Sequence, residues 1–176
     1  MTPRSTPTVF VIDDDVEVRM SIQGLLKAAG LHSESFATAE EFLRNKEPDG
    51  PSCLVLDVSL PGVDGLELQR KLADAGVLIP IIFITGHGDI PMTVKAIKSG
   101  AVEFLTKPFV DEDLLNAIQQ AFDRDRITRH QKGEFDELRG ARNSSSVQFD
   151  RSWTAVFREK ASDTKHGSTT RWVIDS

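Results

Sequence analysis

Four runs of apolar residues in this sequence end in polar side chains of the kinds that bind metal ions and phosphoryl groups. The runs and the residues that follow them are Val9–Ile12 with Asp13, Asp14 and Asp15, Cys53–Leu56 with Asp57, Ile81–Ile84 with Thr85, and Phe104–Leu105 with Thr106, Lys107 and Pro108. Carboxylates this close together would need a cation to stay ionised, and a hard divalent ion such as Mg²⁺ suits oxygen ligands. One carboxylate could then attack phosphorus, while an ammonium and a hydroxyl bind the phosphoryl oxygens.

The elements that must position these residues alternate along the chain, as in βαβ units with a parallel sheet. After the first apolar run, the spacing of Ile22, Leu25, Leu26 and Ala29 predicts one apolar face of a helix. A second strand is expected over His32–Phe36. Thr38 and Glu41 then have the spacing of a capping box, which predicts the start of a short helix.

The second half of the alternation follows the same pattern. A helix with Leu66, Leu68 and Leu72 is expected after the turn Pro61–Gly65, and another from about Pro91 to Ser99 with Val94 and Ile97 as its apolar residues. Asp111–Asp113 place negative charge at the start of a last helix. We therefore expect an α/β fold of five strands and five helices, complete by about Ile127. Carboxyl ends of parallel strands share one edge of a sheet, where α/β proteins bind ligands.

Composition argues against several classes of protein. The formal charge of the 176 residues is −6, which argues against a nucleic-acid coat protein. The single cysteine, Cys53, lies in an apolar run and is expected to be a small buried residue and not a reactive thiol. No stretch approaches the ~20 apolar residues of a membrane span, and the first residues lack the apolar region of a signal peptide. We expect a cytoplasmic protein with no membrane partner.

Each polar residue also has an ordinary interpretation. Consecutive aspartates after a strand can be only a polar loop, and a threonine there is often a turn or capping residue. Their joint occurrence, in order and at strand ends, favours a functional site. The whole set resembles the receiver domain of bacterial two-component response regulators. The resemblance rests on Asp13, Asp14, Asp57, the turn Pro61–Gly65, Thr85, Lys107 and Pro108, and covers about Thr8 to Phe122. Thr85–Met92 with Gly100–Phe104 is similar to the FixJ subgroup.

The resemblance implies a flavodoxin-like (βα)5 doubly wound parallel sheet with strand order 2-1-3-4-5. It also implies that Asp57 accepts a phosphoryl group from a sensor histidine kinase or phosphotransfer protein. Asp14 would bind Mg²⁺ directly and Asp13 through water, with the Ser59 carbonyl as a further ligand. Asp15 is better explained as a solvated residue or a helix N-cap.

The same resemblance implies a switch. On phosphorylation, the Thr85 hydroxyl would turn toward the phosphoryl group and the Phe104 ring would swing inward. The Lys107–Pro108 peptide bond is expected to be cis, which would aim the ammonium at the site. The remodelled face would comprise the fourth helix, fifth strand and fifth helix, and would control partner binding or homodimerisation. Such a protein is a signalling phosphoacceptor that assists its own phosphorylation and dephosphorylation, and not a metabolic enzyme.

Two neighbours of the site carry a further hypothesis. Ser59 lies two residues after Asp57, and His87 lies two residues after Thr85. The resemblance implies that side chains at these positions tune the lifetime of the acyl phosphate. The alternative for His87 is an exposed loop histidine with no such role.

Two other functions fit parts of the pattern. The run from Asp13 to Val16 also satisfies the D-x-D-x-[T/V] motif of haloacid-dehalogenase-like phosphatases, with Asp13 as nucleophile and Asp15 as acid. That interpretation leaves Asp57 without a role and lacks a later strand ending in paired acids. A scaffold that is never phosphorylated is the other alternative. The complete set of acids, with Thr85 and Lys107, argues against it.

The expected organisation is a disordered N-terminus over residues 1–7, a receiver domain over 8–127, a helical linker or extension of the last helix over 128–142, and a charged, weakly structured tail over 143–176. FixJ-like regulators usually continue into a helix-turn-helix domain. The tail shows no such pair of helices and scatters its basic residues among acids. We therefore expect no direct sequence-specific DNA binding, and any effect on transcription would depend on a partner.

Overall fold

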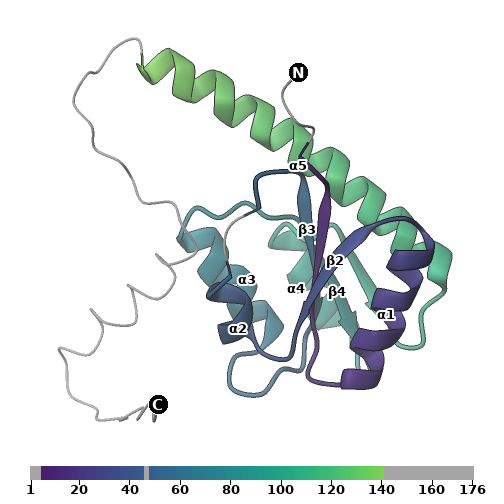
Figure 1. Ribbon diagram of the computed structural model, residues 1–176. Helices are drawn as coiled ribbons and strands as arrows, with labels where there is room; N and C mark the ends of the chain where they lie inside the picture. The colour runs from purple at the N-terminus through teal and green to yellow at the C-terminus, as the bar shows by residue number, and fades with distance from the viewer. Residues whose placement is uncertain (1–4, 46–47, 141–176) are drawn as a thin grey trace, which may run out of the picture.

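The computed structural model describes residues 5–45 and 48–140, which form five parallel strands and five helices (Figure 1). The elements in chain order are β1 Thr8–Ile12, α1 Val16–Ala28, β2 His32–Phe36, α2 Ala39–Leu43, β3 Ser52–Asp57, α3 Gly65–Asp74, β4 Ile81–Thr85, α4 Ile90–Lys98, β5 Glu103–Thr106 and α5 Asp111–Gly140. The sheet order is β2-β1-β3-β4-β5. This confirms the predicted flavodoxin-like doubly wound fold.

The sheet separates two hydrophobic cores because side chains alternate along each strand. Val9 and Val11 of β1 pack with α1 and α5, whereas Phe10 and Ile12 pack with α2, α3 and α4. All residues of β1, β3 and β4 are buried. These three strands therefore read as continuous apolar runs, as expected for a parallel sheet covered on both faces.

Short polar side chains begin four of the helices. Asp15, Thr38, Asp64 and Asp89 each accept a hydrogen bond from a backbone N–H in the first turn. Such N-caps stabilise a helix by about 1 kcal/mol each. The Glu41 side chain also accepts from the backbone N–H of Ala37, so the predicted capping sequence does start α2.

Helix α4 lies within one residue of its predicted bounds but buries little of its surface. It begins at Ile90, and the Asp89 side chain caps it by accepting from the N–H of Met92. Its only buried residue is Ala96, while Ile90, Val94 and Ile97 are exposed. The two apolar residues named from the sequence, Val94 and Ile97, are therefore on the surface.

Helix α5 continues without a break to Gly140, and its second half projects beyond the sheet (Figure 1). The sequence left open whether residues 128–142 are a separate linker or an extension of this helix. The predictions for the first four residues and for the tail 143–176 lie outside the described residues. Among the helices described, none is long and apolar enough to cross a membrane.

Candidate functional site

The polar residues singled out in the sequence meet at the carboxyl-terminal edge of the sheet. Asp13 directly follows β1, Asp57 ends β3, Thr85 ends β4, and Lys107 directly follows β5. Asp57 lies opposite Ile84 in the β3–β4 ladder, and Thr85 lies opposite Thr106 in the β4–β5 ladder. The strand register therefore brings residues up to 94 positions apart to one edge.

Three carboxylates form an acidic cluster at this edge. Asp13, Asp14 and Asp57 each place an oxygen within 4.8 Å of the others. Asp13 and Asp57 are buried, at 0% and 5% exposure, and Asp14 is exposed. The ammonium of Lys107 balances only one of the three negative charges. An unbalanced set of hard oxygen donors, partly open to solvent, fits a divalent cation such as Mg²⁺.

Asp13 is held in place by hydrogen bonds to both its side chain and its backbone. Its carboxylate accepts from the Asp15 backbone N–H at 2.9 Å and from Lys107 Nζ at 2.7 Å. Its backbone carbonyl accepts from the Arg19 guanidinium at 2.6 Å. Arg19 thus ties α1 to the acidic loop. The sequence did not single out this residue, because one arginine in a helix carries no pattern of its own.

The contacts of Asp57 act on its pKa in opposite directions. Its Oδ1 accepts from the Ser59 backbone N–H at 3.1 Å, and its Oδ2 lies 3.4 Å from Lys107 Nζ. Burial raises the pKa of Asp57, with a smaller contribution from the Asp13 charge, and these outweigh the Ser59 hydrogen bond and the Lys107 charge. A cation bound at the cluster would favour its ionised form. The Ser59 contact seen here involves its N–H, so the role of the carbonyl remains a prediction.

Lys107 reaches the cluster from a constrained loop. Its peptide bond with Pro108 is cis, and its backbone N–H donates to the Thr85 carbonyl at 2.7 Å. Burial alone would lower the pKa of Lys107. The hydrogen bond to Asp13 and the charges of Asp13 and Asp57 raise the pKa by more than burial lowers it, so the net change is upward. The side chain therefore stays cationic beside the two buried carboxylates.

Thr85 and Phe104 lie on neighbouring strands beside this cluster. Thr85 is fully buried, and its Oγ1 accepts from the His87 backbone N–H at 3.2 Å. The Phe104 ring is half-buried and packs against Phe83, with ring centroids 6.2 Å apart. His87 itself is exposed in the β4–α4 loop. Both the tuning hypothesis and the plain loop histidine remain compatible with that position.

Gly65 lets α3 start directly beside the end of β3. A Cβ at this position would lie 2.7 Å from the Asp57 carbonyl oxygen and 3.0 Å from Val58 Cα. Such distances are well inside normal contact, so a side chain would push the helix away from the strand end. The Gly65 N–H instead donates to the Val58 carbonyl at 2.8 Å.

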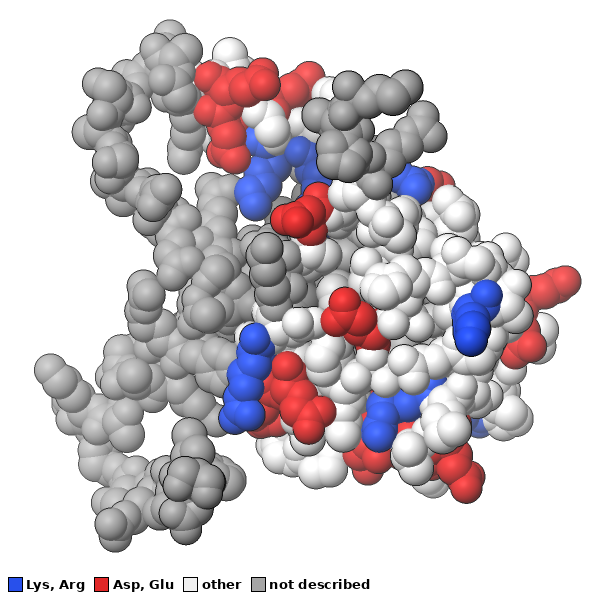
Figure 2. Space-filling view, in the orientation of Figure 1, with Lys and Arg blue, Asp and Glu red and all other residues white. Residues whose placement is uncertain are grey.

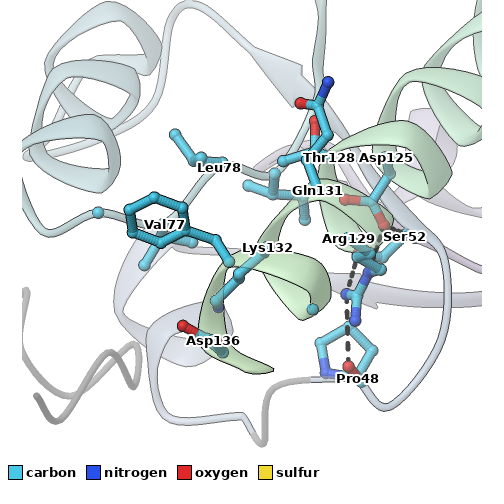
Figure 3. A pocket seen from close by; sticks show the side chains of 14 residues that line it. Pro48, Ser52, Val77, Leu78, Asp125, Thr128, Arg129, Gln131, Lys132 and Asp136 are labelled. Carbon is cyan, nitrogen blue, oxygen red and sulfur yellow. Dashed lines mark hydrogen bonds and ion pairs between the residues drawn. The ribbon is translucent and has the colours of Figure 1, made fainter. Parts of the chain in front are cut away.

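A second polar cluster, at the opposite end of the sheet, was not anticipated from the sequence. Asp125 of α5 is 4% exposed and accepts from the Ser52 backbone N–H at 2.8 Å and from Arg129 Nε at 2.6 Å. Arg129 also reaches the Pro48 carbonyl, beside a groove of about 590 Å³ (Figure 3). This cluster fixes α5 to the start of β3. Burial raises the pKa of the neighbouring Cys53 thiol, and the Asp125 charge adds to this, consistent with an unreactive cysteine.

Charged residues on the surface are mixed. On the face shown in Figure 2, Lys and Arg are interspersed with Asp and Glu, and the described residues in this view form no continuous basic area. A basic stripe is the usual electrostatic footprint of a DNA-binding surface.

Comparison with known proteins identifies relatives. Residues 9–119 match the family model described as response regulator receiver domain. The chain is 54% identical over 121 residues to Nodulation protein W of Bradyrhizobium diazoefficiens, covering 69% of this chain and 53% of the relative. It is 43% identical over 122 residues to the transcriptional regulatory protein FixJ of Azorhizobium caulinodans, covering 69% and 57%. The chain thus spans about half the length of these curated relatives.

Solved structures with the same fold agree. The structure of the response regulator StyR superposes with a TM-score of 0.73 at 45% identity, covering 82% of this chain and 73% of that chain. The beryllofluoride-activated NtrC4 receiver domain dimer superposes with a TM-score of 0.61 at 37% identity, covering 66% and 97%. At 45% and 37% sequence identity, both structures share more with this chain than the fold.

Proposed function

The chain belongs to the response regulator receiver domain family, and on that basis we propose that it is a switch phosphorylated on Asp57. The phosphoryl donor would be the phosphohistidine of a sensor histidine kinase or phosphotransfer protein. The observation that supports this most strongly is the position of the Asp57 carboxylate. It lies within the acidic cluster and 3.4 Å from the Lys107 ammonium, at the edge of the sheet where ligands bind.

The proposed reaction needs positioning more than covalent chemistry from the protein. A carboxylate oxygen of Asp57 attacks phosphorus, the P–N bond to the histidine breaks, and the imidazole leaves and takes up a proton. The Ser59 N–H limits rotation of the attacking carboxylate. Lys107 balances the charge of the phosphoryl oxygens, and the Thr85 hydroxyl, which now accepts from the His87 N–H, would donate to one of them.

Asp13, Asp14 and Asp57, with the Ser59 carbonyl, are the residues that would hold Mg²⁺. The ion would supply positive charge that neutralises the phosphoryl group and the carboxylates. Arg19 and the Asp15 N–H keep the Asp13 peptide and carboxylate in place for this role.

The proposed output is a change on the α4–β5–α5 face. Thr85 and Phe104 connect the site to this face, and α4, one of its elements, carries the exposed apolar residues Ile90, Val94 and Ile97. Exposed apolar patches of this kind commonly bind other proteins. The dimeric form of the related NtrC4 receiver supports homodimerisation on phosphorylation as one outcome.

Two substitutions separate this function from the phosphatase alternative. Intact mass is measured after incubation with phosphoramidate, with and without Mg²⁺, on wild type, Asp57→Asn and Asp13→Asn. We expect a Mg²⁺-dependent phosphoryl adduct on the wild type and none on Asp57→Asn. An adduct that persists in Asp57→Asn but vanishes in Asp13→Asn would contradict the proposal and favour Asp13 as the nucleophile.

A further inference from the structure

Gly88, in the loop between β4 and α4, lies beside both residues of the proposed switch. A Cβ on Gly88 would lie 3.0 Å from Phe104 Cε1, 3.1 Å from Thr85 Cγ2 and 3.3 Å from Thr106 Cγ2. Carbon atoms in favourable contact are about 3.5–4.0 Å apart. The space that a side chain would need is therefore already filled by the Phe104 ring and two methyl groups.

Neighbouring groups restrict how the Phe104 ring can leave this space. On its inner side lies Phe83, which is fully buried in the sheet. The methyl groups of Thr85 and Thr106 are attached to paired strands, whose backbones are fixed by the β4–β5 ladder. A side chain at position 88 would consequently displace the Phe104 ring toward solvent.

We propose that Gly88 is a positioning residue of the switch, whose missing side chain allows the Phe104 ring to pack in its half-buried place against Phe83. The signalling consequence rests on the proposed function: a ring kept outside weakens the change that phosphorylation produces on the α4–β5–α5 face. The requirement is one of space and not of backbone conformation. Gly88 is not among the glycines with left-handed φ, so alanine can adopt its backbone.

The same loop contains a matched control. Gly86 is exposed like Gly88, also lies outside the left-handed region, and a Cβ there would meet nothing within 4 Å. Gly86→Ala and Gly88→Ala therefore make the same chemical change two residues apart. Only the second places a methyl group against the Phe104 ring.

The test measures the exposure of the ring directly. The full chain is produced with 4-fluorophenylalanine, and Phe104→Leu identifies the ¹⁹F resonance of Phe104. The change in its shift between H₂O and D₂O reports solvent exposure before any phosphorylation. We expect Gly88→Ala to move this resonance and increase its solvent dependence, with the balance between buried and exposed ring changed about tenfold. Gly86→Ala should match the wild type. Coincidence of Gly88→Ala with the wild type would overturn the inference.

Two further measurements separate the inference from the proposed function. Gly88→Ala should destabilise the chain more in the wild-type background than in the Phe104→Leu background, where only the two threonine methyl groups remain close, and an equal cost in both would contradict a clash with the ring. Addition of Mg²⁺ and beryllofluoride should shift the Phe104 resonance of the wild type, and Gly88→Ala should need about tenfold more beryllofluoride for the same shift. No shift in the wild type would refute the switch while leaving the steric result standing. Equal midpoints would refute the role of Gly88 in switching.

Discussion

The buried contact between Lys107 and Asp13 gives the most quantitative prediction. Lys107→Met removes an ammonium 2.7 Å from Asp13 Oδ2 and 3.4 Å from Asp57 Oδ2, and keeps most of the aliphatic side chain. At an effective dielectric constant of ~20, two unit charges 2.7 Å apart attract by about 6 kcal/mol. Desolvation of the lysine, whose side chain is 23% exposed, offsets part of this. Removal of one partner of a buried pair costs about 3–5 kcal/mol, so we expect a loss of about 3 kcal/mol in the free energy of unfolding.

Lys71→Met is the matched control. Lys71 pairs with Glu67 at the same N–O distance of 2.7 Å, but the Glu67 side chain is 38% exposed, whereas that of Asp13 is fully buried. Exposed pairs contribute less than about 1 kcal/mol. The two variants therefore differ in the burial of the pair and not in its length.

The assay is urea unfolding followed by far-UV circular dichroism at pH 7, with EDTA and with saturating MgCl₂. The pKa of Lys107 is raised in the folded state, so its contribution is complete below the ordinary lysine pKa and is lost only at higher pH. Mg²⁺ should restore more stability to Lys107→Met than to wild type, because the two carboxylates have lost their competing cation. A loss no greater than that of Lys71→Met, or equal recovery with Mg²⁺, would refute this account of the site.

Three other perturbations have defined outcomes. Burial raises the pKa of Asp57, so between its ordinary value and the raised folded value the native state binds more protons and stability falls as pH rises. Asp57→Asn should therefore remove this slope in EDTA and raise the free energy of unfolding at pH 7, and an unchanged pH profile would contradict this. Arg129→Met leaves the buried Asp125 without its cation and should lower the free energy of unfolding by about 3 kcal/mol. Arg126→Met breaks an exposed pair and should lower it by less than about 1 kcal/mol. Equal losses in urea unfolding would argue against the buried cluster. His87→Ala should change the half-life of the phosphorylated chain, measured by intact mass over time, without preventing phosphorylation, and unchanged decay would leave His87 as an ordinary loop residue.

Local sequence signals predicted the elements that position the site. The apolar runs before Asp13, Asp57 and Thr85 are strands because their residues pack on both faces of the sheet. The capping box at Thr38 predicted α2 because the threonine hydroxyl accepts from the Glu41 N–H in the first turn, while the Glu41 carboxylate accepts from the Ala37 N–H just before the helix. These features depend on neighbours in the chain, which is why sequence alone revealed them.

Features that depend on the tertiary fold could not be found in this way. Asp125 contacts Ser52 across 73 positions, and nothing near it in the sequence distinguishes it from the other acids of α5. The steric role of Gly88 appears only when Phe104 and Thr106 of the neighbouring strand are in place. The sequence identified Val94 and Ile97 as the apolar residues of α4, but such a pattern cannot distinguish a face that packs on the core from one that is left exposed.

The central claim is that the phosphoryl group is carried by Asp57. The most direct test is borohydride reduction of the chain after phosphoramidate and Mg²⁺ treatment, followed by peptide mass spectrometry. Reduction of an acyl phosphate converts the aspartate to homoserine and so marks the position that carried the phosphoryl group. We predict homoserine at position 57, absent without Mg²⁺. Homoserine at position 13, or none at any position in a sample whose intact mass shows the adduct, would contradict the claim.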